Sequence, residues 1–140
     1  MKVLFYVALT SLLAACATTS ISPASEAYFR CAMAFPLRFA IPNNEAEIAW
    51  GRAQSFVGRF SSMKLQVATD YVIQTYNPES AWEFGYAATR TPGIGHALCD
   101  VDCQTGGTLG ADEAEQNAHI FAYYVKTGLI PPDISLIAPH

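Results

Sequence analysis

The sequence has few charged residues and no cluster of basic ones. Only 14% of its 140 residues are charged, and 8 lysines and arginines stand against 12 acidic residues. Nucleic-acid-binding domains gather lysine and arginine into a patch or stripe. Since no basic run exists here, we expect no nucleic acid among the partners.

The sequence also lacks the common catalytic motifs. It has no Gly-x-Ser-x-Gly elbow, and the glycines at 91–95 are not followed by the lysine and helix start of a phosphate-binding loop. The acidic residues that open the last predicted helix complement its dipole without implying acid–base chemistry. We therefore name no catalytic residue and no cofactor, and we expect a protein that is not an enzyme.

A stretch long enough to span a membrane is missing as well. The apolar stretch from Val3 to Leu13 is shorter than the roughly 20 apolar residues of a spanning helix. It follows a basic residue, Lys2, and ends in small residues, which is typical of a cleaved signal peptide. We expect residues 1–15 to address the chain and to take no part in the fold.

The end of this stretch, Leu13-Ala14-Ala15-Cys16, resembles the lipobox of bacterial lipoproteins. The resemblance implies cleavage before Cys16, a diacylglycerol on its sulfur and a fatty acid such as palmitate on the new amino group. Inner-membrane retention is usually marked by aspartate where this chain has Ala17, so the resemblance favours an outer-membrane anchor with the domain in the periplasm. Each buried CH₂ would contribute about 0.8 kcal/mol to anchoring. The alternative is an ordinary signal peptide cleaved after Ala15.

The remaining chain divides into three segments by composition. Small polar residues and Pro23 predict that 16–26 is the lipidated cysteine followed by a flexible tether. Mixed apolar patterns predict one α+β domain over 27–128. Several prolines predict a tail over 129–140 that lies along the domain in extended form, with a loose tail as the alternative.

Apolar periodicity predicts the first elements of the domain. Alternation over 28–39 predicts a strand with Cys31 on its buried face. Helical spacing predicts a helix over about 45–60, with Asn44 as its N-cap and Glu47 as the capping partner.

Three further segments are typical of strands, and a helix follows them. The strand segments are 64–78, 82–92 and 97–104, and whether Thr69-Asp70 forms a bulge or a hairpin turn is left open. Asp112 with Glu115 predicts a capping box for a second helix that Gly128 ends.

This order of elements predicts a two-layer α+β sandwich, with an antiparallel sheet of about four strands and two helices on one face. The order β-α-β-β-β-α, together with Trp50 on the first helix, is similar to small bacterial envelope domains with a fold like half of the TATA-box-binding protein. That family has no assigned activity, so the resemblance implies a fold and not a reaction.

The cysteines suggest one disulfide. If Cys16 is lipidated, three thiols remain in an oxidising compartment. Cys99 and Cys103 are about 13 Å apart on an extended strand, whereas bridged Cα atoms lie about 4.4–6.8 Å apart. We therefore expect Cys31 to pair across strands, with Cys103 preferred over Cys99, and the third thiol to be buried.

A second possibility is a metal-binding or thiol-redox accessory protein. His96, Cys99, Cys103 and His119 are the residues that suit zinc or copper. Against this, their spacing is no recognised ligand pattern, and oxidised cysteines do not coordinate metals. We expect no metal at these residues.

Our preferred hypothesis is a binding surface on the sheet. If Trp82, Phe84 and Tyr86 face away from the helices, they form an exposed apolar patch, and such patches mark interaction sites. In the alternative they face the core. The sequence thus predicts a lipid-anchored, non-enzymatic binding or assembly module with an envelope protein as its partner.

Overall fold

The computed structural model describes residues 21–137, so the predicted signal peptide and Cys16 lie outside the described residues. The described chain forms five strands, three α-helices and one 3₁₀ turn. In order these are α1 (Pro23–Met33), β1 (Arg38–Pro42), α2 (Ala46–Phe60), β2 (Leu65–Ala68), β3 (Val72–Thr75), β4 (Phe84–Pro92), β5 (His96–Thr105), α3 (Ala111–Thr127) and η1 (Ile134–Leu136).

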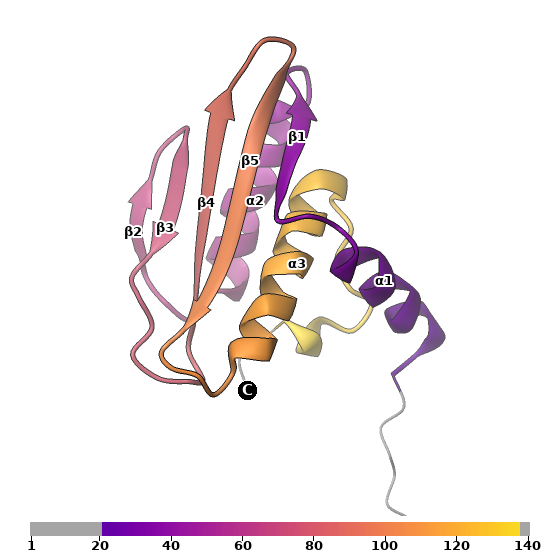
Figure 1. The fold of residues 1–140 in the computed structure, drawn as a ribbon, viewed down its shortest axis with the longest axis vertical. Coiled ribbons are helices and arrows are strands. Elements are labelled where there is room, and N and C mark those ends of the chain that lie inside the picture. Colours follow the sequence, from indigo (N-terminus) through magenta and orange to yellow (C-terminus); the bar gives the residue numbers. More distant parts are fainter. Residues whose placement is uncertain (1–20, 138–140) are drawn as a thin grey trace, which may run out of the picture.

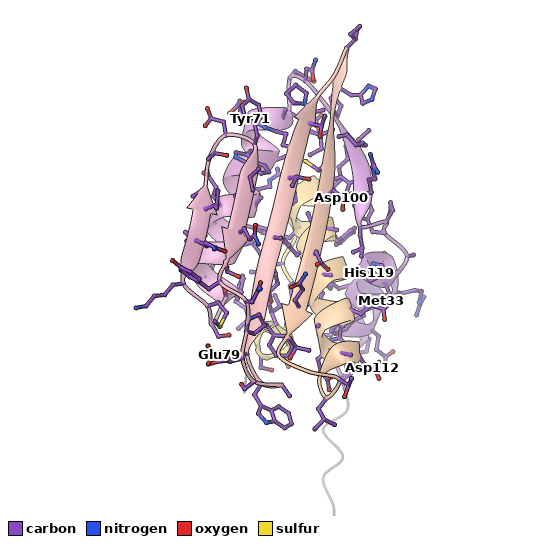
Figure 2. All side chains as sticks on the ribbon, turned by 60° about the vertical axis from the view of Figure 1, so that its left-hand side comes forward. Met33, Tyr71, Glu79, Asp100, Asp112 and His119 are labelled. Atoms are coloured by element: carbon purple, nitrogen blue, oxygen red, sulfur yellow. The ribbon has the colours of Figure 1, made fainter. Side chains whose placement is uncertain are left out.

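All strands belong to one antiparallel sheet with the order β1-β5-β4-β3-β2. Helices α2 and α3 cover one face of the sheet, and the other face is open (Figures 1 and 2). Helix α1 lies beside α3, where the rings of Tyr28 and Tyr123 are 5.4 Å apart. The predicted α+β class with an antiparallel sheet is confirmed, while the sheet has one strand more and the helical layer one helix more than expected.

The core lies between the sheet and helices α2 and α3. Alternate residues of β4 and β5 point into it, because successive side chains of a strand face opposite sides. At its centre the ring of Phe56 on α2 is 4.7 Å from that of Phe121 on α3 and 5.4 Å from that of Tyr86 on β4. Burying each of these rings contributes about 1.5–3 kcal/mol, so this cluster joins the two layers.

The first element differs from its prediction, because residues 23–33 form a helix and not a strand. Ser22 caps this helix by accepting a hydrogen bond from the Ser25 N–H at 3.2 Å, and Pro23 stands in the first turn, where no N–H is needed. Its buried residues Tyr28 and Ala32 are four apart, which is a helical spacing. The helix also includes the last residues of the range expected to be a tether.

The two long helices confirm their predicted positions but not their predicted caps. The N-cap of α2 is Glu45 and that of α3 is Gly110, and neither makes a side-chain capping hydrogen bond. Asn44 therefore lies one residue before the N-cap of α2. Asp112 is the second residue of α3, two positions after its N-cap. Gly128 ends α3 in the left-handed conformation, with φ of 76°, as predicted.

The segment 64–78 is a hairpin, which settles the question left open at Thr69. The Thr69 hydroxyl oxygen accepts hydrogen bonds from the N–H groups of Tyr71 and Val72, at 3.2 and 2.9 Å, and so forms the turn between β2 and β3. After α3 the tail forms η1 and buries Ile137 against the core, where an extended form was expected.

Candidate functional site

The predicted aromatic surface does not form as a unit. Phe84 and Tyr86 point toward the helices and are only 7% and 1% exposed, whereas Trp82 is 70% exposed and lies before β4 begins. The alternative in which this set faces the core holds for the two strand residues. Trp82 alone remains at the surface.

The predicted metal ligands do not converge. His96 is exposed at the start of β5, and Cys99 and Cys103 lie on the opposite, buried face of that strand. His119 projects from α3, with Nδ1 2.8 Å from the carbonyl oxygen of Phe35. Between residues 21 and 137, no group of three or more His, Cys, Asp or Glu side chains is placed to hold a metal ion.

The three described cysteines are free thiols, and the bridge from Cys31 is not formed. Cys31 lies on α1 with an exposed side chain, so the strand geometry that favoured the bridge is absent. Burial raises the pKa of Cys99 to about 11 and that of Cys103 to about 12. Both thiols are therefore protonated near neutral pH, which makes them poor nucleophiles and poor redox groups.

A hollow of the described surface lies between the end of β5 and the start of α3. It is an open groove of ≈ 500 Å³, which we call the β5–α3 groove. Its walls come from β5 and the loop after it, from α3 and from the residue before β1; they are Leu37, Asp102, Cys103, Gln104, Thr105, Gly107, Ala111, Ala114, Glu115 and Ala118. Three alanines on α3 leave the room that larger side chains would fill.

The groove exists because β5 is longer than its neighbour β1. Strand β1 pairs with β5 from His96 to Asp100, and the N–H of Val101 still donates to the carbonyl of Leu37 at 3.0 Å. Before Leu37 stands Pro36, which has no N–H for a sheet, and the chain turns away into α1. Residues 102–105 of β5 thus lie beyond the reach of β1 (Figure 1).

This end of β5 presents backbone groups to the groove. In an antiparallel pair the hydrogen-bonding groups of alternate residues point to the same neighbour. The N–H of Val101 points toward β1. The backbone hydrogen-bonding groups of Cys103 and Thr105 therefore point to the same side of β5, where no strand continues. The N–H of Cys103 donates instead to Oδ1 of Asp102 at 2.9 Å, so a carboxylate occupies the place of a strand carbonyl.

The charge of the groove is acidic. Asp102 and Glu115 line it, and its walls contain no lysine or arginine. The other oxygen of Asp102 accepts a hydrogen bond from Nε2 of Gln104 at 2.8 Å. Asp112, in the first turn of α3, adds a further carboxylate at this lower end of the molecule (Figure 2).

A second feature missed by the sequence analysis is the buried Arg90 at the opposite end of the sheet. It lines a smaller hollow of ≈ 250 Å³ together with Tyr71, and its Nε donates to the carbonyl of Asp70 at 3.0 Å. The alternation of β4 contained the signal, since Arg90 has the same parity as the buried Phe84 and Tyr86. Its partners are mainly backbone groups, which indicates a structural role for Arg90.

Comparisons of the chain with protein-family models, with curated proteins and with solved structures each found no match. The two resemblances stated from the sequence stay predictions. Within residues 21–137, none of the helices combines the length and the apolar character needed to cross a membrane.

Proposed function

We propose that this chain is a lipid-anchored envelope lipoprotein whose domain binds a protein partner at the β5–α3 groove and performs no catalysis. The observation that carries the proposal is the uncovered end of β5, residues 102–105, above a groove of ≈ 500 Å³. Unpaired strand edges are places where another chain adds, and folds that do not use them usually cover them. The sequence Leu13-Ala14-Ala15-Cys16 supports the anchor.

The chemistry of the groove favours binding over reaction. Its potential nucleophiles are Cys103 and Thr105. Burial raises the pKa of the Cys103 thiol to about 12, and the Thr105 hydroxyl donates to the carbonyl of Ala81 at 3.0 Å. The carboxylate of Asp102 is already engaged by two hydrogen bonds. Glu115 on α3 is the other titratable group of the wall, and among the described residues no hydrogen bond joins it to Asp102 or Cys103, so the groove shows no proton-transfer pair.

The anchor is tested by metabolic labelling with a palmitate analogue in a bacterial host. The natural chain should incorporate the label and sediment with membranes, and Cys16→Ser should do neither. Label on the Cys16→Ser chain, or a natural chain without label, would rule out lipidation at this residue.

The binding role is tested by site-specific photocrosslinking in the same cells. A photoreactive phenylalanine at Ala111, on the rim of the groove, should crosslink one recurring protein, and the same group at Ala68 on β2 should not. The captured protein must then bind the purified lipoprotein in detergent. Identical products from both positions, or no binding after purification, would remove the groove as the binding surface.

A further inference from the structure

We propose that the occupant of the β5–α3 groove is an extended segment of the partner protein that adds to β5 as a further strand, with an apolar side chain opposite Cys103 and a basic one opposite Asp102. This inference rests on the proposed function and names the chemistry of the partner. It follows from the direction of the backbone groups of β5 and from the charge of the groove walls.

The backbone of β5 defines the register of the added strand. Cys103 and Thr105 point their hydrogen-bonding groups toward the groove, so each faces one residue of an antiparallel segment. The carbonyl of the incoming residue takes the N–H of Cys103, which now donates to Asp102 at 2.9 Å. Binding of the segment thus displaces the Asp102 carboxylate from the N–H of Cys103.

The side-chain preferences of the segment follow from the two faces of the sheet. Residues opposite each other on neighbouring strands point to the same face. The residue opposite Cys103 therefore points toward the helices, into a hollow walled by Ala114 and Ala118. An aliphatic side chain of the size of valine suits this hollow, since it buries apolar surface there without displacing the helix.

The residue opposite Asp102 points to the open face of the sheet. Once displaced from the Cys103 N–H, the Asp102 carboxylate is free to pair with a lysine or arginine at this position. Glu115 on the helical wall adds to the negative potential of the groove. Electrostatic complementarity of this kind mainly increases the association rate and selects against acidic segments.

The same charges argue against a second copy of this chain as the occupant. Edge-to-edge pairing of two β5 strands would bring Asp102 and Glu115 of both copies into one interface, without a basic residue in the groove walls to balance them. Like charges placed opposite each other destabilise a strand pair. A basic segment of another protein satisfies both the hydrogen bonds and the charge.

The probe is a blocked hexapeptide, acetyl-Thr-Val-Thr-Val-Lys-Thr-amide, titrated calorimetrically into the detergent-solubilised full-length lipoprotein. In antiparallel register its second valine stands opposite Cys103 and its lysine opposite Asp102. We expect binding at least about tenfold tighter than that of the same peptide with glutamate for lysine, because one charge-assisted contact contributes about 1.4 kcal/mol or more. Methylation of the second valine nitrogen should weaken binding by a similar factor, because it removes one backbone donor.

Variants of the protein test the location. Ala111→Trp narrows the rim and should weaken the lysine peptide about tenfold or more. Ala68→Trp, the same change at an exposed residue of the opposite edge strand, should leave the affinity unchanged. Asp102→Asn should reduce the difference between the lysine and glutamate peptides. Amide hydrogen exchange of Cys103 and Thr105 should slow in the complex.

Three results would overturn this inference. They are equal affinity for the methylated peptide, unchanged affinity in Ala111→Trp, and a dimer in sedimentation that Ala111→Trp dissociates, which would make a second copy the occupant. Absence of peptide binding, while the photocrosslink at Ala111 persists, would leave the proposed binding function in place and reject the added strand. Loss of the crosslink would reject both.

Discussion

The guanidinium of Arg90 on β4 and the carboxylate of Glu47 on α2 form an ion pair, with Nη1 and Oε1 2.8 Å apart. The two side chains differ in environment, since that of Arg90 is 7% exposed and that of Glu47 is 85% exposed. Arg90 also donates to the carbonyls of Ala46 and Asp70, at 3.3 and 3.0 Å, and lies 5.2 Å from the ring centre of Trp50. It therefore ties the start of α2 and the β2–β3 turn to the sheet.

This arrangement predicts unequal effects of removing the two partners. Arg90→Met should lower the free energy of unfolding by about 2–4 kcal/mol, because the buried carbonyl of Ala46 and the partly buried carbonyl of Asp70 lose their donor. Glu47→Gln should cost less than about 1 kcal/mol, because exposed carboxylates contribute little. Urea unfolding followed by circular dichroism measures both. Equal losses would show that the ion pair, and not the backbone hydrogen bonds, accounts for the role of Arg90.

Two neighbouring glycines after β5 provide a second prediction. A Cβ on Gly106 would overlap the backbone of Glu79 and Ser80, whereas a Cβ on Gly107 meets no atom within 4 Å. Gly106→Ala should therefore cost about 1–3 kcal/mol of unfolding free energy. Gly107→Ala should be neutral or stabilise by up to about 1 kcal/mol, because it restricts the unfolded chain. Thermal unfolding of both variants tests this pair, and a reversed order would contradict it.

The buried thiols predict a loss of stability in alkali. Burial raises the pKa of Cys99 from 9.0 to about 11 and that of Cys103 from 9.0 to about 12. Since the folded state holds these protons more tightly, their contribution to stability is complete below pH 9 and is lost as the pH rises toward 11–12. At pH 10 we expect a loss of about 1 kcal/mol per thiol.

Urea unfolding at several pH values above neutrality checks this expectation. The double variant Cys99→Ala, Cys103→Ala should show a shallower decrease with pH, even if its stability at neutral pH is lower. Burial also raises the pKa of Tyr86 and Tyr28, so part of the decrease should persist in this variant. An unchanged slope would mean that the two thiols do not contribute.

The exposure of the cysteines predicts an order of alkylation. Cys31 is exposed on α1, while Cys99 and Cys103 are buried. Iodoacetamide at neutral pH should therefore modify Cys31 first and the other two only in denaturant. Peptide mapping by mass spectrometry identifies the modified sites. A map of the native protein in which Cys31 is linked to Cys103 would contradict the structure and restore the disulfide predicted from the sequence.

Local patterns were sufficient for the elements whose residues repeat with one clear period. The helix predicted over 45–60 occurs as α2, and Gly128 ends α3, because glycine takes the left-handed conformation without a steric cost. The strand predicted over 97–104 occurs as β5, where the alternating Cys99, Val101 and Cys103 are buried on the core face.

Residues 28–39 were misassigned because their pattern fits two periods. Apolar residues fall on every second position, yet Tyr28 and Ala32 also share a helical face. The helix forms instead of the strand because its buried face packs on α3, as the contact between Tyr28 and Tyr123 shows. Such a decision depends on residues about a hundred positions away.

By itself, then, the sequence determined the α+β class, the long helices and the core face of β5, since these depend on neighbours within a few residues. It also supplied the predicted anchor at Cys16. Only the tertiary structure decided that β1 begins at Arg38, opposite Asp100, while β5 continues to Thr105. Strand pairing is non-local, so the difference in length that opens the β5–α3 groove appears only when the two strands meet. Arg90 is similar, because its partners come from two separate segments, the β2–β3 turn and the start of α2, that only the fold brings next to β4.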